Sequence, residues 1–233
     1  MVELIDSAGL LKSMDYDFHV FVESAVKPLT VAERFSDILP GLGGSTSSRG
    51  RSLAERLLYV HQRQALEDLS SGLNLVLKAG TGSGKTEAWF LYAAKNRVKT
   101  LTVYPTLALA NDQQQRLSDY CNELDMTLES IDASRKQEHL KNMGARELRR
   151  KITEADIVVT NPAFLMNELK RIAFGQPSLL RDFLAGCGLV VLDEFDFYGP
   201  RSTSILLAMM RVVVEIINPS IQITIMTATL QDP

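Results

Sequence analysis

The stretch that decides the fold is Ala79-Gly80-Thr81-Gly82-Ser83-Gly84-Lys85-Thr86. It follows an apolar run, 73–77, and precedes a segment, 87–95, whose pattern is typical of a helix. A strand, a glycine-rich turn ending in Gly-Lys-Thr and a helix form a phosphate-binding loop, because backbone N–H groups converge there on a triphosphate. We therefore predict an ATP site, with these ligands: Gly80, Thr81, Gly82, Ser83, Gly84, Lys85 and Thr86.

Two side chains of this loop have distinct predicted roles. The ammonium group of Lys85 reaches the β- and γ-phosphates, and the hydroxyl of Thr86 binds Mg²⁺. Ala79 stands where the commonest form of the motif has a glycine, a change that the three remaining glycines make tolerable. A chance glycine-rich turn is the alternative, but packing gives no reason for a Lys-Thr pair there. A dinucleotide-binding fingerprint is disfavoured because Lys85 occupies the place of its third small residue.

The rest of the chain alternates short apolar runs with helical patterns. This alternation predicts an α/β fold, a mostly parallel sheet with helices on both faces. The expected strands are 73–78, 100–104, 128–132, 157–160, 189–192 and 221–226, and the expected helices between them are 86–95, 107–121, 145–153, 163–172 and 203–217. Ligands of such sheets bind at the carboxyl ends of the strands.

The N-terminal part has weaker periodicity. We expect helices over 2–14 and 31–39, an edge strand over 18–22, and a flexible linker over 40–50, which is rich in glycine and serine. Helices over 52–57 and 62–69 precede the first core strand. The predicted organisation is an N-terminal extension and linker, 1–50, followed by one nucleotide-binding domain, 51–233.

A pair of acids follows the apolar run 189–192. Asp193 and Glu194 place charge at the end of a strand that is predicted to be buried. Phosphate-loop ATPases use such a pair, in which the first acid holds Mg²⁺ and the second orients and deprotonates the attacking water. We assign these roles to Asp193 and Glu194, with Lys85 as the third catalytic residue; the alternative is a solvated acidic turn.

Composition excludes several classes of protein. With 45% hydrophobic and 23% charged residues, the 233-residue chain is an ordinary globular protein. A net charge of -3 gives no overall attraction to nucleic acid, so any such binding must be local. Cys121 and Cys187 suggest two reduced, buried thiols. No apolar run is long enough to span a bilayer and no signal peptide is evident, so we expect a cytoplasmic protein without a membrane partner.

These motifs together resemble the first RecA-like domain of superfamily 2 helicases of the DEAD/DEAH-box kind. The residues that carry the resemblance are the loop 79–86, Asp193-Glu194-Phe195-Asp196 and Thr227-Ala228-Thr229. Upstream, Gln62 in Leu58-Tyr59-Val60-His61-Gln62 matches the glutamine that reads adenine in the family, and Tyr59 is a weaker candidate for contact with the base. Taken alone, Gln62 reads as an exposed polar residue on a helix.

The resemblance also implies contacts with nucleic acid. Tyr104-Pro105-Thr106-Leu107-Ala108-Leu109-Ala110 and Val159-Thr160-Asn161-Pro162 are similar to motifs that hold the nucleic-acid backbone in the family. The residues implied are Pro105, Thr106, Thr160, Asn161 and Pro162. Taken alone, Thr106 and Thr160 read as helix caps. In the family, the residues that match Thr227 and Thr229 link the acid motif to strand separation, with Asp196 as their expected partner.

The chain also departs from the family pattern. Phe195 is bulky where a small residue is usual, Thr227 replaces the commoner serine, and 131–133 lack a glycine that often contacts nucleic acid. A basic segment from Arg135 to Lys151 reads as a solvated helical face, with the steering of a polynucleotide as its alternative. The family's second RecA-like lobe, with its arginine fingers, is not seen in 1–233, so we expect it on a longer chain or another polypeptide.

The resemblance thus implies the ATP-binding lobe of a helicase or translocase that uses Mg-ATP and single-stranded nucleic acid, DNA favoured over RNA. The loop and the 104–110 segment are similar to those of CRISPR-associated helicases, and a repair helicase fits them equally well. A nucleotide-gated module that binds a protein partner without translocation is the alternative from another class. An unrelated phosphate-loop kinase lacks support, because no lid for an acceptor substrate is evident.

Overall fold

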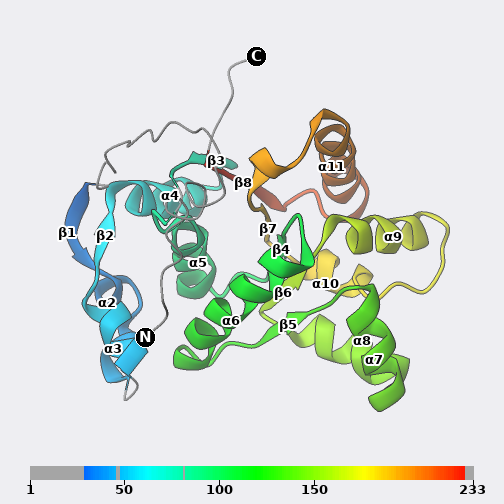
Figure 1. Ribbon diagram of the computed structural model, residues 1–233, viewed down its shortest axis with the longest axis horizontal. Coiled ribbons are helices and arrows are strands. Elements are labelled where there is room, and N and C mark those ends of the chain that lie inside the picture. Colours follow the sequence, from blue (N-terminus) through cyan, green and yellow to red (C-terminus); the bar gives the residue numbers. More distant parts are fainter. Residues whose placement is uncertain (1–28, 46–47, 81, 229–233) are drawn as a thin grey trace, which may run out of the picture.

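A computed structural model describes residues 29–45, 48–80 and 82–228 (Figure 1). Its centre is a six-stranded sheet in the order β3-β8-β7-β4-β6-β5, and every neighbouring pair is parallel. The strands are β3 (Leu75–Lys78), β4 (Thr100–Val103), β5 (Leu128–Ser130), β6 (Ile157–Thr160), β7 (Leu189–Leu192) and β8 (Gln222–Thr227). The predicted α/β fold with a parallel sheet is confirmed, because each short apolar run forms a strand and a helical segment connects it to the next.

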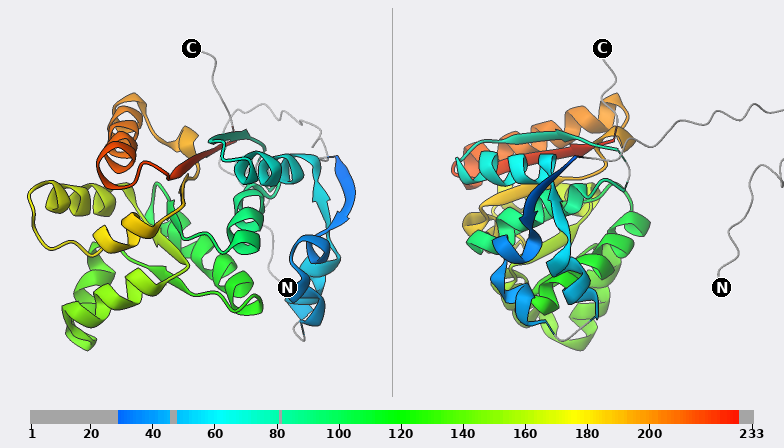
Figure 2. Two further views of the ribbon diagram at one scale, coloured as in Figure 1. Left: turned by 180° about the vertical axis from the view of Figure 1, so that it is seen from behind. Right: turned by 90° about the vertical axis from the view of Figure 1, so that its left-hand side faces the viewer.

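Helices cover both faces of the sheet and give a three-layer, RecA-like fold (Figure 2). One hydrophobic cluster joins α4 (Val60–Ser70), α5 (Lys85–Asn96) and α6 (Leu107–Glu123) to strand residues such as Val159 and Val191. The other joins the helices α8 (Gly144–Glu154), α9 (Pro162–Ala173), α10 (Arg181–Gly186) and α11 (Pro200–Val212) to Val158 and Val190. Alternate residues of one strand thus enter opposite cores, as the pleat of a strand requires.

Two helices were not expected from the sequence. The helix α7 (Ala133–Asn142) follows β5 and has no buried residue, so its polar sequence gives no apolar stripe to detect. The six-residue α10 is too short for a helical period to show. A 3-10 turn, η2 (Phe195–Phe197), precedes α11. A π-helical turn, η3 (Val213–Ile217), follows α11.

The segment 30–58 differs from the prediction of a helix followed by a flexible linker. β1 (Thr30–Arg34) pairs antiparallel with β2 (Leu57–Tyr59), and between them lie α2 (Phe35–Ile38), the 3-10 helix η1 (Pro40–Gly44) and α3 (Ser48–Glu55). Phe35 and Leu42 are fully buried in the same cluster as α4 and α5. Phe35, Leu39 and Leu42 therefore anchor this segment, and its described residues among 40–50 do not form the flexible linker expected from composition. The elements expected over 2–14 and 18–22 lie outside the described residues.

Trp89 and Phe90 lie in the core, and both cysteines are buried free thiols. Burial raises the pKa of the Cys187 thiol to about 12. None of the helices in the described part of the chain combines the length and apolar character that crossing a membrane requires.

Candidate nucleotide-binding site

The phosphate loop joins β3 to α5 at the carboxyl edge of the sheet (Figure 1). Gly82 and Gly84 have left-handed backbone angles, with φ of 75° and 79°. A Cβ atom on Gly84 would lie 2.4 Å from Nε2 of Gln62, so glycine is required there both by conformation and by space. Ser83 N donates to the Gly80 carbonyl (3.2 Å) and closes the turn. Thr81 lies outside the described residues.

Lys85 is held inside this loop. Its side chain is buried, and Nζ donates to the carbonyl oxygens of Ala79 (3.0 Å) and Gly80 (3.4 Å). A buried ammonium surrounded by loop atoms is a preformed positive charge, and carbonyl contacts are weaker than those it would make with a phosphate anion. The loop therefore presents the cation that a triphosphate needs.

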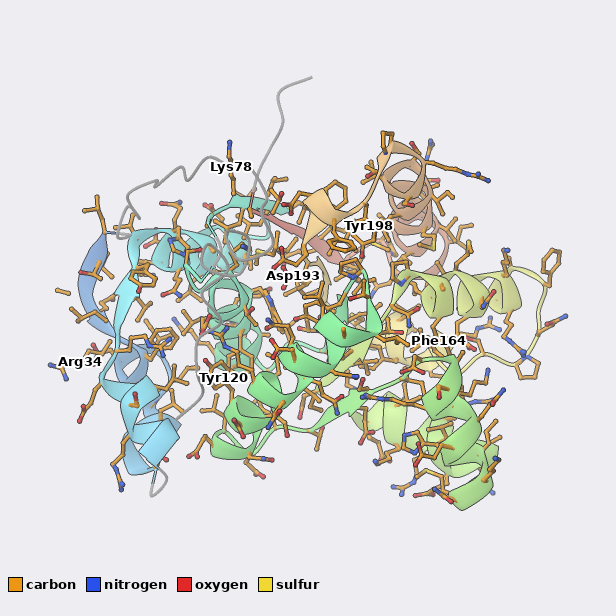
Figure 3. All side chains as sticks on the ribbon, in the orientation of Figure 1. Arg34, Lys78, Tyr120, Phe164, Asp193 and Tyr198 are labelled. Atoms are coloured by element: carbon orange, nitrogen blue, oxygen red, sulfur yellow. The ribbon has the colours of Figure 1, made fainter. Side chains whose placement is uncertain are left out.

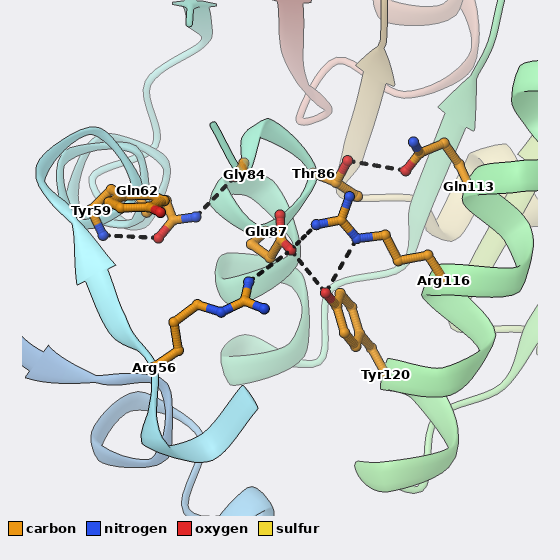
Figure 4. Close-up of polar contacts among 9 residues, drawn as sticks. All are labelled: Arg56, Tyr59, Gln62, Gly84, Thr86, Glu87, Gln113, Arg116 and Tyr120. Carbon is orange, nitrogen blue, oxygen red and sulfur yellow. Dashed lines mark hydrogen bonds and ion pairs between the residues drawn. The ribbon is translucent and has the colours of Figure 1, made fainter. Parts of the chain in front are cut away.

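Thr86 begins α5 beside α6. Its hydroxyl donates to Oε1 of Gln113 at 3.2 Å (Figure 4). A hydroxyl that donates its proton to an amide oxygen keeps its lone pairs for another partner, and a lone pair is what a metal ion accepts. Nothing in the sequence marks Gln113, which lies 27 residues away, as a partner of the loop.

Gln62 contacts the loop directly (Figure 4). Its side chain is fully buried; Oε1 accepts from Tyr59 N (2.9 Å) and Nε2 donates to the Gly84 carbonyl (3.0 Å). Reading Gln62 as an exposed polar residue is therefore wrong. Tyr59 is half-buried and stacks on His61, with ring centroids 5.6 Å apart. Contacts of Gln62 and Tyr59 with adenine stay predictions.

The acid pair follows β7, two strands from β3 in the sheet. Asp193 is almost fully buried near the middle of the molecule (Figure 3), and its Oδ1 accepts from Glu194 N at 2.8 Å. The pKa of Asp193 is raised to about 6, chiefly by burial and in addition by the neighbouring Glu194 and Asp196 carboxylates, whereas the hydrogen bond from Glu194 N and the charge of Lys85 lower it. A carboxylate kept so far from water is poised to gain from a cation.

Glu194 has a left-handed backbone, with φ 48° and ψ 50°. For a residue other than glycine this conformation is strained, and such strain concentrates at functional sites. It ends the extended run of β7 and starts the turn η2. The third acid, Asp196, accepts from Ala228 N at 3.4 Å, so the acid motif contacts the Thr-Ala-Thr stretch; the partnership of Asp196 with Thr227 and Thr229 stays a prediction. Thr227 is buried at the end of β8, and Thr229 lies outside the described residues.

The sequence did not reveal a buried network around Glu87, the residue after Thr86 (Figure 4). The fully buried Glu87 carboxylate accepts from Arg116 and from Tyr120 Oη (2.8 Å), and Arg56 lies at 3.5 Å. This carboxylate thus ties the loop helix α5 to α6 and to the segment that ends in α3. An acid next to Lys-Thr was visible, but its partners come from distant parts of the chain.

The nucleic-acid residues implied by the resemblance lie at the ends of β4 and β6. Thr106 caps α6 through Leu109 N (3.3 Å), so its capping role is confirmed. Thr160 is not a cap: its buried hydroxyl donates to the Ile131 carbonyl (2.8 Å), and Asn161 caps α9 by accepting from Phe164 N (2.9 Å). Pro105, Asn161 and Pro162 line a common groove.

Most of the basic segment is paired within the protein. Arg135 donates to Gln114 (2.6 Å) and Asn111 (2.7 Å), Lys136 to the buried Glu168 (3.0 Å), and Arg150 to Glu147 and Glu154. The contacts of Arg135 and Lys136 hold α7 against α6 and α9, whereas the pairs of Arg150 lie within the exposed face of α8. Both arrangements favour a role within the protein over the steering of a polynucleotide.

The oxygen donors at this edge suit Mg²⁺ bound together with a nucleotide. In the described residues no cluster of three or more histidine, cysteine or acidic side chains could hold a metal by itself. Mg²⁺ is commonly held by one or two protein oxygens plus substrate phosphates, and Thr86 and Asp193 are oxygen donors of this kind.

The sequence profile of the DEAD/DEAH box helicase family matches residues 59–233. The chain belongs to this family. The match begins at β2 and runs through both candidate motifs, so this DEAD/DEAH box domain contains the whole parallel sheet.

Relatives in sequence agree with this membership. An uncharacterized ATP-dependent helicase of Methanocaldococcus jannaschii is 28% identical over 186 residues, 76% of this chain and 26% of the relative. The ATP-dependent DNA helicase Hel308 of Thermoplasma acidophilum is 25% identical over 181 residues, 75% of this chain and 24% of the relative. The chain thus spans about a quarter of the length of these relatives.

Two solved structures show the same fold. The DUF1998 helicase MrfA bound to DNA and AMPPNP has a TM-score of 0.65 at 19% identity, covering 97% of this chain and 31% of that one. The Mycobacterium smegmatis helicase Lhr bound to ssDNA and AMP-PNP has a TM-score of 0.58 at 22% identity, covering 74% of this chain and 23% of that one.

Proposed function

We propose that this chain is the ATP-binding lobe of a helicase or translocase that couples Mg-ATP hydrolysis to the separation of nucleic-acid strands. We further propose that the nucleic acid is DNA. The observation that carries the proposal is the meeting of three parts at one edge of the sheet. These are the phosphate loop after β3, the acid pair after β7, and the contact of Asp196 with Ala228 after β8.

The residues divide the chemistry among them. Lys85 and the loop N–H groups would bind the triphosphate, and Thr86 and Asp193 would hold Mg²⁺, whose charge would offset that of the phosphates. Glu194 orients the attacking water and accepts its proton. Asp196 couples this site to the end of strand β8 through its hydrogen bond with Ala228 N.

A second RecA-like lobe completes the site in this proposal. Arginine fingers that reach in from a partner stabilise the transition state and contribute roughly 10³ to 10⁵ in rate. We therefore expect slow or no ATP turnover by this chain alone. Robust turnover that Glu194→Gln abolishes would contradict the need for the second lobe.

DNA is proposed as the polymer because Hel308 is named a DNA helicase, and MrfA and Lhr were solved with DNA. The test is fluorescence anisotropy with oligothymidylate and oligouridylate of equal length, with and without Mg-AMP-PNP, over a series of salt concentrations. We expect DNA to bind more tightly, with an affinity that falls as salt rises. Lack of affinity for both polymers would favour the nucleotide-gated protein-interaction module instead.

A further inference from the structure

A groove of about 410 Å³ lies beside the acid motif, where β4 and β6 end and α11 begins. Pro105, Asn161 and Pro162 form one side, and Phe197 and Ile205 belong to the other. Figure 3 shows Tyr198, a further lining residue, between the turn η2 and α11. The motif residues of the helicase resemblance therefore share this groove with a segment to which the resemblance assigns no role.

The walls suit a flat, uncharged, aromatic group. Met166, Met209 and Ile205 give apolar surface, and no carboxylate, ammonium or guanidinium group is among the described residues that line the groove. Phe197 is 65% exposed, although aromatic rings of its size are normally buried. Tyr198 packs edge-on against Phe195, with ring centroids 6.0 Å apart, and supports this wall.

The rim of the groove is polar, in contrast to its apolar walls. Asn161 and Ser202 place polar groups there, and the amide nitrogen of Asn161 has no hydrogen-bond partner among the described residues. The helix α9 begins at Pro162 on the groove, and α6 begins at Leu107, two residues after the lining residue Pro105, so the positive ends of two helices lie near this rim. A ligand with a flat apolar face and attached anionic groups complements both features, and a nucleotide of a single strand is such a ligand.

We propose that this groove takes an unstacked base of a single-stranded nucleic acid, with Phe197 as its stacking partner and with the adjoining phosphates at the N-termini of α6 and α9. The inference rests on the proposed function and extends it. Motifs that hold only the backbone give no contact with bases, whereas this lobe would bind one base by stacking, without reading its identity.

The test compares oligothymidylate with an abasic oligonucleotide of the same length, which keeps the sugar-phosphate backbone. Stacking of a base on an aromatic side chain is worth about 5- to 100-fold in affinity. We expect the wild-type chain to bind oligothymidylate more tightly than the abasic strand by a factor in this range. Phe197→Ala should remove that preference and leave abasic binding unchanged, and Phe197→Trp should keep it.

Phe174→Ala is the matched control, because this ring is 78% exposed and follows the other end of α9. It should leave both affinities unchanged. Since Phe197 is exposed, its replacement should not lower the melting temperature. Equal binding of the two oligonucleotides by the wild type, or a preference that survives Phe197→Ala, would overturn the inference and leave the groove to an apolar side chain of a protein partner. Failure to bind either oligonucleotide would instead remove the proposed function on which the inference rests.

Discussion

Asp193 shows how a single residue serves function at the expense of stability. Its carboxyl lies at the end of a fully buried strand, accepts one backbone hydrogen bond, and has a pKa raised to about 6 because burial disfavours its charge. The folded protein therefore binds this proton more tightly than the unfolded chain does. Above pH 6 the ionised group lowers stability, and the loss is relieved as the pH falls from about 6 towards 4.

Replacing Asp193 with asparagine should stabilise the protein in the absence of nucleotide and metal. The amide keeps an oxygen for Glu194 N but carries no charge, so the variant should gain about 1 to 3 kcal/mol at about pH 8 and lose this advantage near pH 4. Chemical denaturation at the two pH values measures the difference. The same variant should lose Mg²⁺-dependent nucleotide binding. A variant that is less stable than wild type at the higher pH would show that the Asp193 charge is already well solvated or paired.

At the scale of elements, the buried Glu87 carboxylate connects the helices α5 and α6 with the chain that follows α3. Arg116 from α6 pairs with it. Burial lowers the pKa of the Arg116 guanidinium, but the charge of Glu87 and the hydrogen bond with Tyr120 outweigh it and raise the pKa. Arg56 approaches the same carboxylate from the chain that follows α3. The orientation of the loop helix α5 is therefore fixed by helices on one face of the sheet.

Arg116→Ala should destabilise the protein by about 2 to 4 kcal/mol, because it leaves a fully buried carboxylate with weakened compensation. Arg150→Ala is the matched control: its pairs with Glu147 and Glu154 are exposed on α8, where solvent screening leaves such pairs little effect on stability. Urea denaturation of both variants measures the contrast. Similar losses in the two variants would mean that Glu87 is stabilised without Arg116.

Leu42→Ala tests whether the segment before residue 51 belongs to the domain. Leu42 is fully buried, so its truncation should lower the free energy of unfolding by about 2 to 5 kcal/mol. Leu73→Ala, at a position 54% exposed, should change it by less than about 1 kcal/mol. If Leu42→Ala leaves the denaturation midpoint unchanged, Leu42 does not anchor the segment, and the flexible linker predicted from composition would be correct.

These elements also show what sequence reasoning can reach. β6 and β7 form where the apolar runs predicted them, because a buried parallel strand needs a continuous apolar run and nothing else. The prediction failed in the segment 40–50 because its composition is typical of a linker, whereas the buried side chain of Leu42 anchors it. Pairings such as Thr86 with Gln113, or Thr160 with Ile131, depend on how helices and strands pack, which no local pattern encodes. Local motifs therefore predicted the candidate site, and packing supplied its supporting contacts.

At the scale of the whole molecule, the parallel sheet of this DEAD/DEAH box domain brings four features to one edge. They are the phosphate loop, the acid motif, the end of β8 and the groove. The domain spans about a quarter of its relatives, so the remaining steps of a helicase cycle belong, in our proposal, to a second lobe. What this lobe must do by itself is bind Mg-ATP.

The measurement that tests this claim most directly is calorimetric titration of the chain with Mg-ATP, repeated on Lys85→Ala. We predict binding to the wild type and at least about tenfold weaker binding to the variant, because in our proposal the ammonium would contact the phosphates through charge-assisted hydrogen bonds. The melting temperature without ligand should change little, since the hydrogen bonds that Lys85 makes among the described residues are with the loop carbonyls of Ala79 and Gly80. Equal binding by both proteins, or no heat of binding with the wild type, would contradict the assignment of this loop as the nucleotide site.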